Sequence, residues 1–310
     1  MKRHSVMTKK QTVFSRIVVW WFLFCLSFFS SCESEEEEKI IPVSQTGLTV
    51  QKVIFALKPT DQFGKPLAQV NTIENHLTEK LNCLVETTIP LDLSVLAESF
   101  RLGEIDLAYL KPQDALHAID EKTASALLVR LPDDKPEKSI WLCRKDKNFT
   151  NISEAKNKAI AFANRKSDSG YLIPIRDLER RNLIGSDRAL TDFFSLVIYG
   201  DDFDSLVKKV LSGEVEALAA SSHDFDGLSG KIKSELRVFQ EQGVAPTEVL
   251  CIRSSISAAD QKIIRQALLE LNTNHPELAQ RAFQGVLGYP DKAHLKLTRE
   301  SLEAIKAVKP

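Results

Sequence analysis

Apolar residues follow two patterns that alternate along most of the chain. Short continuous apolar or β-branched runs predict strands, as in KVIFAL (52–57) and AIAFA (159–163). Other segments carry apolar residues three or four positions apart, as in LAQVNTIENHLTEKL (67–81), and predict amphipathic helices. The expected strands are 52–57, 83–89, 105–110, 126–131, 139–144, 159–163, the end of 192–200, 215–220, 236–240 and 248–253.

Local signals mark where several helices begin and end. Gly103 follows an apolar helical segment and suits its carboxyl end. Ser153 is a candidate N-cap, and Ser257 with Asp260 has the spacing of a capping box. Pro174 is compatible with a helix only near its first turn or at a kink. The expected helices are 67–81, 93–103, 113–120, a short one near 153, 169–182, 203–213, 257–272, one opening at Pro276, and 298–308.

This alternation of strands and helices predicts an α/β protein with mainly parallel sheets. The stretches FRLGEIDLAYL (100–110) and VLSGEVEALAA (210–220) both read as a helix, Gly-Glu and a strand, which indicates two similar lobes. Hydrophobic residues make up 43% of the 310 residues and charged residues 27%, so the composition is that of a globular protein. The formal net charge of −1 lacks the basic excess of a nucleic-acid-binding protein.

The first 31 residues have the pattern of an export signal. They contain basic but no acidic residues, and the apolar run 17–29 is short for a bilayer span. The sequence FSSC ending at Cys32 resembles a bacterial lipobox, which implies that Cys32 is acylated and becomes the first mature residue. An uncleaved anchor and ordinary cleavage near Cys32 are the alternatives. The acidic run 33–39 predicts that 32–47 forms a solvated tether.

The cysteines of the body suggest no metal or redox centre. Cys83, Cys143 and Cys251 remain once the signal and the lipid site are set aside. Cys143 and Cys251 lie in predicted strands. We expect them to be buried thiols, and the alternative is a disulfide between them in an oxidising compartment. No CxxC or Cys/His cluster, nucleophile–base pair or phosphate loop occurs, so we expect no metal, no cofactor and no enzyme activity.

The order of several motifs resembles the phosphonate-type periplasmic substrate-binding proteins of ABC transporters. That resemblance implies a type 2 periplasmic binding protein with a ligand cleft between two lobes. It places 48–143 and 252–310 in the first lobe, 144–251 in the second, and the hinge near 143–145 and 250–253. The motifs are FALKPT (55–60), LNCLVETT (81–88), RLGEIDLAYLKP (101–112), IWLCRKD (140–146), AIAFAN (159–164), SDSGYLIP (167–174), IYG (198–200), LSGEVEALA (211–219) and LCIRSSIS (250–257).

The Ser-x-Ser-Gly loop is the strongest candidate for ligand contact. Ser167 and Ser169 offer hydroxyl groups before a predicted helix, and Gly170 permits close approach of the backbone. Free N–H groups at the positive end of a helix dipole bind anions. The simpler alternative is that one of the serines only caps the helix.

Acidic residues stand at positions where the family has neutral or basic ones. Asp168 replaces a threonine of the family triplet, and Asp201 follows the strand ending at Gly200 where the family often has Ser-His or His. An acid of the family maps near Ser222 and His223, and a family tyrosine maps near Glu137 or Lys138. Glu248 precedes the second hinge strand, where the family often has an acid. The candidate ligand residues are Ser167, Asp168, Ser169, Gly170, Asp201, His223 and Glu248.

These acids bear on the charge of the ligand. Two like charges 4 Å apart repel by ~4 kcal/mol at an effective dielectric of ~20. An ordinary phosphonate therefore fits poorly if Asp168 and Asp201 face it. As an alternative, Asp168 acts as an N-cap and turns its carboxylate onto the helix amides.

The resulting function is a lipid-anchored, monomeric solute-binding protein of an ABC uptake system. A ligand-sensing subunit for a membrane sensor kinase is the alternative, and neighbouring permease or kinase genes would separate the two. A phosphonate, phosphite or phosphate binder whose carboxylates are turned away is the third possibility.

Overall fold

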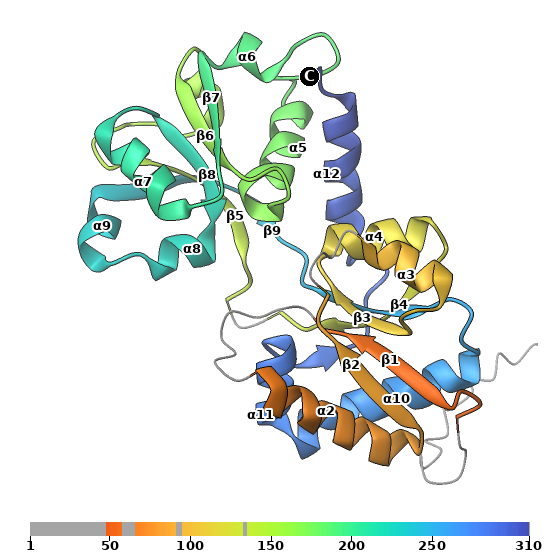
Figure 1. Cartoon of the computed structure of the whole chain (residues 1–310). Coiled ribbons are helices and arrows are strands. Elements are labelled where there is room, and N and C mark those ends of the chain that lie inside the picture. The colour runs from red at the N-terminus through yellow and green to blue at the C-terminus, as the bar shows by residue number, and fades with distance from the viewer. Residues whose placement is uncertain (1–47, 58–65, 91–94, 133–134, 310) are drawn as a thin grey trace, which may run out of the picture. The chain divides into compact units, whose positions relative to one another are not determined.

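The computed structural model describes residues 48–57, 66–90, 95–132 and 135–309. The predicted export signal 1–31, Cys32 and the tether 32–47 lie outside the described residues. The described chain forms two mixed β-sheets, each with helices on both faces (Figure 1). The prediction of an α/β protein with two lobes is confirmed.

The first sheet has the strand order β11-β4-β10-β3-β1-β2. Strands β1, β2 and β3 are parallel, whereas β10 is antiparallel to both β3 and β4. The expectation of mainly parallel sheets is therefore too simple, because β10 and β11 run opposite to the other four strands. The strands are β1 (Lys52–Ala56), β2 (Leu84–Thr88), β3 (Leu107–Leu110), β4 (Ala124–Arg130), β10 (Val249–Arg253) and β11 (Leu287–Gly288).

Helices cover both faces of this sheet. One face packs against α2, α10 and α11 through a buried cluster that includes Phe55, Leu77 and Leu268. The other face packs against α3 and α4 through residues such as Phe100 and Ala115. The helices are α2 (Pro66–Leu81), α3 (Leu96–Leu102), α4 (Pro112–Asp120), α10 (Ala258–Asn274) and α11 (Pro276–Phe283).

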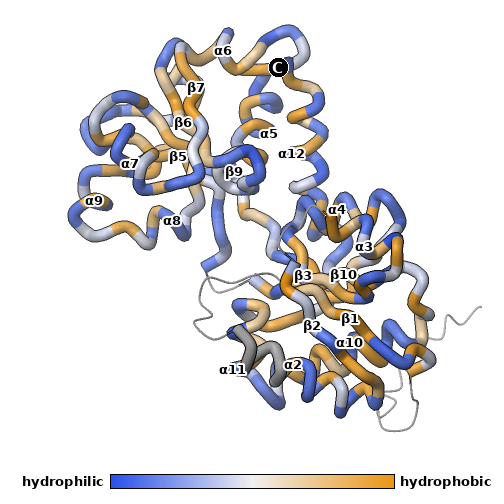
Figure 2. The backbone as a smooth tube through the Cα atoms, in the orientation of Figure 1, coloured by the Kyte–Doolittle hydropathy of each residue, from blue (hydrophilic) through white to orange (hydrophobic). Residues whose placement is uncertain are grey.

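The second sheet has the order β7-β6-β8-β5-β9 and a similar plan. Its strands are the apolar centre of a three-layer unit, with more polar helices outside (Figure 2). The strands are β5 (Lys138–Arg144), β6 (Ala159–Ala163), β7 (Leu196–Gly200), β8 (Ala217–Ser221) and β9 (Leu236–Val244). The helices are η3 (Ile152–Ala155), η4 (Asp168–Leu172), α5 (Ile173–Arg180), α6 (Leu190–Phe193), α7 (Phe203–Ser212), α8 (Ser222–Gly227), α9 (Gly230–Glu235) and α12 (Lys296–Ala307).

The repeated Gly-Glu unit has the same geometry in both sheets. Gly103 ends α3 with φ of 75° and Gly213 ends α7 with φ of 79°, a conformation that favours glycine. A Cβ added at Gly103 would lie 3.6 Å from Arg253 Nη1, and one at Gly213 would lie 3.7 Å from Arg144 Nη1. The two units therefore have the same backbone conformation at the glycine and a similar arginine neighbour, as the sequence repeat predicted.

Three local signals are resolved by tertiary context. Asn151, rather than Ser153, caps η3, because its side chain accepts the Ser153 N–H at 3.0 Å. Ser257 caps α10, as predicted. The Asp260 carboxylate of the predicted capping box accepts hydrogen bonds from Thr49. Pro174 falls in the first turn of α5, after the π-helical turn η4.

The sheets show where the chain crosses between the lobes. All of β5 belongs to the second sheet and all of β10 to the first, so the connections lie before β5 and between β9 and β10. They are earlier in the chain than the hinge positions expected from 143–145 and 250–253. The predicted hinge segments belong to β5 and β10, which are internal strands of the two sheets. The sequence could not show this, because an apolar run predicts a strand without indicating which sheet the strand joins.

The last helix and the cysteines also refine the sequence-based picture. Leu302 and Ile305 of α12 pack against the core of the second sheet, although 252–310 was expected in the first lobe. Cys143 and Cys251 are buried free thiols in different sheets. Burial raises the pKa of the Cys143 thiol and raises that of Cys251 to about 12, so both are unreactive near neutral pH.

Candidate functional site

Strand direction brings three of the predicted ligand segments to one edge of the second sheet. Strands β6, β7 and β8 are parallel, so the loops that follow their carboxyl ends share an edge. Those loops contain 167–170, Asp201 and His223. Strand β5 is antiparallel to β8, with Ser139 opposite Ser221, so Glu137 just before β5 joins the same edge.

The first of these segments is built around a serine cap. Ser167 Oγ accepts the Gly170 N–H at 3.0 Å and so caps η4. A Cβ at Gly170 would lie 2.4 Å from the Cβ of Ala163, which is too close for any other residue without displacement. The capping role that we considered for one serine is therefore present, and it uses the Ser167 hydroxyl group.

Ser169 is bound to a carboxylate of the protein itself. It is 1% exposed, and its hydroxyl group donates to the Glu137 carboxylate. Ser139 Oγ donates to the Ser169 carbonyl oxygen at 2.6 Å, which holds this turn against β5. Glu137 thus accepts the hydrogen bond that an anionic ligand would accept from Ser169.

Asp168 is an enclosed carboxyl group without a full set of partners. Its Oδ1 atom is buried and has no hydrogen-bond partner. Burial raises the pKa of Asp168 to about 7, and the charges of Glu137 and Asp114 raise it further. Hydrogen bonding to Gln113 and the charge of Lys111 lower it only in part.

The N-cap alternative for Asp168 is wrong. Ser167 occupies the cap position, and Asp168 Oδ1 does not accept a helix N–H. The reason is local: the turn after β6 is π-helical and begins one residue earlier than an Asp168 cap would require.

His223 and Asp201 lie at the exposed part of this edge. His223 Nε2 lies 3.0 Å from the Lys135 carbonyl oxygen, and its Nδ1 lies 3.9 Å from Glu137 Oε2. The histidine therefore adds positive charge beside Glu137 when it is protonated. Asp201 is exposed, while the neighbouring Asp202 caps α7 through the Ser205 N–H at 3.2 Å.

Glu248 is placed on the first sheet and is already paired. Its Oε2 accepts from Arg130 Nε at 3.0 Å, with 13% and 16% of the two side chains exposed. The Arg130 N–H also donates to the Glu248 carbonyl oxygen at 3.0 Å. Through these two contacts Glu248 joins β4 to the start of β10.

The amino end of α4 contributes residues that the sequence analysis did not select. Gln113 Nε2 donates to the Lys166 carbonyl oxygen at 2.8 Å, next to Asp168. The signal was available, because extending the internal repeat past both strands aligns Lys111-Pro112-Gln113 with the Ser-Ser-His sequence ending at His223.

The combined site is rich in hydrogen-bond acceptors. Glu137, Asp168, Asp201 and Asp224 all belong to the loops or termini at this edge. Burial and the charge of Glu137 raise the pKa of Asp224 as well. A ligand group that carries N–H donors and positive charge would find accessible acceptor oxygens at Glu137 and Asp201, while Asp168 Oδ1 is enclosed beside them.

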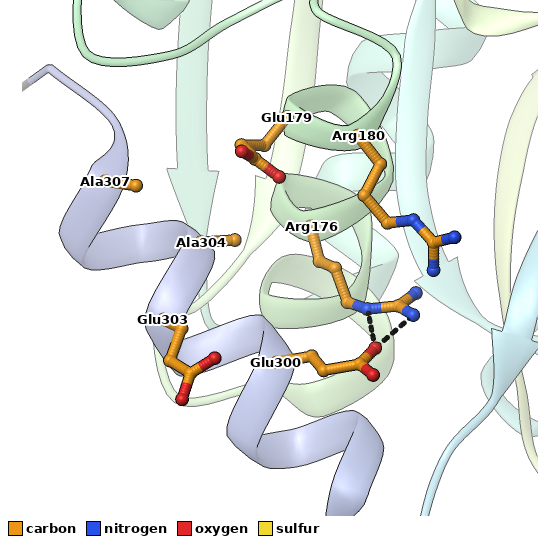
Figure 3. Close-up of a pocket in the computed structure, with 7 residues that line it drawn as sticks. All are labelled: Arg176, Glu179, Arg180, Glu300, Glu303, Ala304 and Ala307. Carbon is orange, nitrogen blue, oxygen red and sulfur yellow. Dashed lines mark hydrogen bonds and ion pairs between the residues drawn. The ribbon is translucent and has the colours of Figure 1, made fainter.

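One large cavity lies away from these residues. It has a volume of about 440 Å³ between α5 and α12 (Figure 3). Arg176 and Glu300 at this cavity are hydrogen-bonded to each other, and Glu179, Arg180 and Glu303 surround them. Its charges are of both signs, and its Arg176 and Glu300 already bind each other, so we do not place the ligand there.

The described part of the chain contains no group of three or more potential metal ligands. Within the same residues, each helix is too short or too polar to cross a bilayer.

Comparison with known proteins identifies the class and then the family. A family model described as "ABC transporter, phosphonate, periplasmic substrate-binding protein" matches residues 55–289. No protein with a curated description matches the chain by sequence. The chain has the two-lobe α/β fold of type 2 periplasmic binding proteins and belongs to the phosphonate-type substrate-binding family of ABC transporters.

Solved structures agree with this fold. XAC2383 from Xanthomonas citri bound to ATP has a TM-score of 0.69 and 16% identity, over 84% of this chain and 100% of that chain. PhnD1 from Prochlorococcus marinus in complex with methylphosphonate has a TM-score of 0.59 and 16% identity, over 83% and 98%. The aliphatic sulphonate binding protein SsuA from Escherichia coli has a TM-score of 0.54 and 11% identity, over 83% and 88%.

Family membership implies a small-molecule ligand, an ABC permease as partner and a location outside the cytoplasm. The family model describes substrate-binding proteins of ABC transporters.

Proposed function

We propose that this chain is a lipid-anchored solute-binding protein whose ligand is neutral or cationic rather than a phosphonate dianion. The lipid is attached at Cys32, and the ligand binds at the edge formed by 167–170, Glu137 and His223. The solute is delivered to an ABC permease, in keeping with the family.

The hydrogen bond from Ser169 to Glu137 is the observation that carries the ligand class. A hydroxyl group that would donate to a ligand oxyanion donates instead to a carboxylate of the protein. The enclosed Asp168 Oδ1 adds a second acceptor beside it. An oxyanion placed here would meet two carboxyl groups, whereas an ammonium or amide N–H would satisfy them.

Calorimetry with methylphosphonate, phosphite and phosphate tests this ligand class. We expect no binding tighter than roughly 10 µM, given the repulsion of several kcal/mol between like charges at this range. A thermal-shift screen of neutral and cationic solutes should in contrast yield stabilising ligands, because binding to the folded state raises stability. Nanomolar binding of methylphosphonate would show that the carboxylates do not face the ligand.

A double substitution tests the same residues in the opposite direction. Asp168→Thr with Asp201→His moves the site toward the family pattern and removes two carboxyl groups. We expect phosphonate affinity to rise by at least tenfold, which corresponds to about 1.4 kcal/mol. Asp146→Thr with Asp187→His, at exposed positions outside the segments that form this edge, is the control with the same residue changes. Equal affinity of the two variants would contradict the placement of the ligand.

The lipid anchor is tested separately. Cys32→Ala removes the only thiol of the lipobox-like sequence, so the protein should leave the membrane fraction or keep its uncleaved signal. Cys83→Ala is the matched control, because Cys83 lies between α2 and β2 in the folded body. Membrane fractionation and the mass of the mature protein report the outcome. Unchanged fractionation and mass of the Cys32 variant would exclude acylation at this residue.

A further inference from the structure

A second cavity, of about 370 Å³, lies over the outer strand β7 between α5 and the end of α12. Its walls include the apolar side chains of Ile175, Val197, Ile305 and Val308. Ile175, Val197, Ile305 and Val308 also pack in or against the core of this face of the sheet, so the walls are held by the fold. Volumes of ~300 Å³ and above are typical of small-molecule sites.

Two tyrosines and an arginine give this cavity its polar part. The Arg165 guanidinium lies 4.7 Å from the centre of the Tyr199 ring, in a cation–π contact. The Tyr171 and Tyr199 rings pack edge to face, with centroids 5.8 Å apart. Tyr171 is 8% exposed, and both tyrosines line the cavity together with its apolar walls.

The cavity is positively charged. Arg165 and Lys309 line it, and none of its lining residues is acidic. Neither Arg165 nor Lys309 forms an ion pair with a carboxylate of the described residues. The guanidinium therefore keeps its N–H donors available for a bidentate contact with an anionic group.

We propose that this cavity is a second binding site, which takes a small organic anion with an aromatic or alkyl body. Arg165 binds the anionic group, the tyrosine hydroxyl groups donate to it, and the apolar walls receive the hydrocarbon part. The site differs from the predicted ligand site in its lining, because the end of α12 forms one wall and Glu137 and Asp168 are absent from it. It also has the opposite charge.

Three naphthalene probes separate the contributions of charge and hydrocarbon. Calorimetry is carried out with naphthoate, naphthylmethanol and naphthylmethylammonium on the mature protein. We expect naphthoate to bind at least tenfold more tightly than the neutral alcohol, and the cation to bind most weakly. Equal affinity of the three probes would overturn the proposal, because it would leave only non-specific apolar contact.

Substitutions locate the bound probe. Arg165→Gln keeps much of the side-chain stem and removes the charge, and we expect it to weaken naphthoate binding by tenfold or more. Lys208→Gln has the same charge change at an exposed position of α7, on the opposite face of the sheet, and should leave the affinity unchanged. Circular dichroism and melting temperature verify that both variants are folded.

A third variant distinguishes this cavity from the predicted ligand site. Glu137→Gln alters the latter only, so it should leave the naphthoate affinity within a factor of two. If Glu137→Gln changes the affinity while Arg165→Gln does not, the probe binds at the other site and the proposal is wrong. This result would not depend on whether phosphonates are excluded from the site at Glu137.

Discussion

Asp168 and Glu137 show how single residues change the chemistry of a family site. Ser169 is positioned to donate a hydrogen bond, but Glu137 accepts it within the protein. Asp168 adds a buried carboxyl group whose pKa of about 7 places its titration near neutral pH. The charge of the site consequently depends on pH in the range where an exported protein works.

Asp168→Asn should change how stability depends on pH. Burial raises the folded-state pKa from 3.8 to about 7, so this carboxyl group stabilises the fold below about pH 4 and loses that contribution as pH rises to 7. The amide cannot ionise and removes the loss. Between pH 5 and pH 8 the variant should lose about 2 kcal/mol less unfolding free energy than the unsubstituted protein.

Urea unfolding at the two pH values measures this difference. Asp201→Asn is the matched control, because Asp201 is exposed and its replacement should leave the pH dependence of stability unchanged. Identical pH dependence in all three proteins would show that Asp168 is not held in a buried, protonated form.

At the scale of elements, the helix–Gly–Glu–strand unit is the repeated part of both lobes. In each copy a glycine with positive φ reverses the chain from the helix into a strand, above an arginine at the end of the neighbouring antiparallel strand. The side chain of Asp106 links neighbouring strands in the first copy: it accepts a hydrogen bond from the Ile54 N–H at 2.8 Å and forms an ion pair with Arg253. In the second copy the corresponding Glu216 pairs with Lys147 instead.

Gly213→Ala should destabilise the second lobe through backbone conformation alone. The added Cβ would lie 3.7 Å from Arg144 Nη1, which is an ordinary contact, so only the left-handed backbone is strained. We expect a loss of about 1 kcal/mol in the free energy of unfolding. Gly227→Ala is the control, since a Cβ there meets nothing within 4 Å and its φ is not positive. Equal effects in urea denaturation would contradict this explanation.

At the scale of the whole folded body, α12 contacts helices that belong to both sheets. Arg299 pairs with Asp120 of α4, and the next residue, Glu300, pairs with Arg176 of α5. The main chain continues this contact, because the Lys309 N–H donates to the Gly185 carbonyl oxygen at 2.9 Å. The helix therefore joins the two lobes after the chain has crossed between them a third time, from β11 to α12.

Glu300→Gln should cost more stability than Asp120→Asn. The Arg176 side chain is 13% exposed, so loss of its partner leaves a largely enclosed charge, and we expect about 1–3 kcal/mol. The pair of Arg299 and Asp120 is about half exposed, and its loss should cost less than about 1 kcal/mol. Urea denaturation of the two variants measures the difference, and a larger cost for Asp120→Asn would show that the α4 contact dominates.

Periodicity alone was sufficient for most elements. Strands such as 159–163 and helices such as 203–213 are encoded by local spacing of apolar residues, and the Gly-Glu repeat revealed the two lobes. The order of the motifs was sufficient to identify the family, because that order can be recognised without knowing which side chains contact one another. The N-cap of η3 shows the limit of such signals, because Asn151, two residues before the predicted Ser153, provides it.

Tertiary structure decided which residues meet. Strand direction brought Glu137, Asp168 and His223 together from distant parts of the chain, and it placed Glu248 beside Arg130 instead. It also decided that β5 and β10 are central strands rather than the crossings themselves, and that α12 packs against α5. These outcomes depend on strand pairing and burial between residues far apart in the sequence. Such contacts raise the pKa of a carboxyl group or give a hydroxyl group its hydrogen-bond partner, and the local spacing of apolar residues does not predict them.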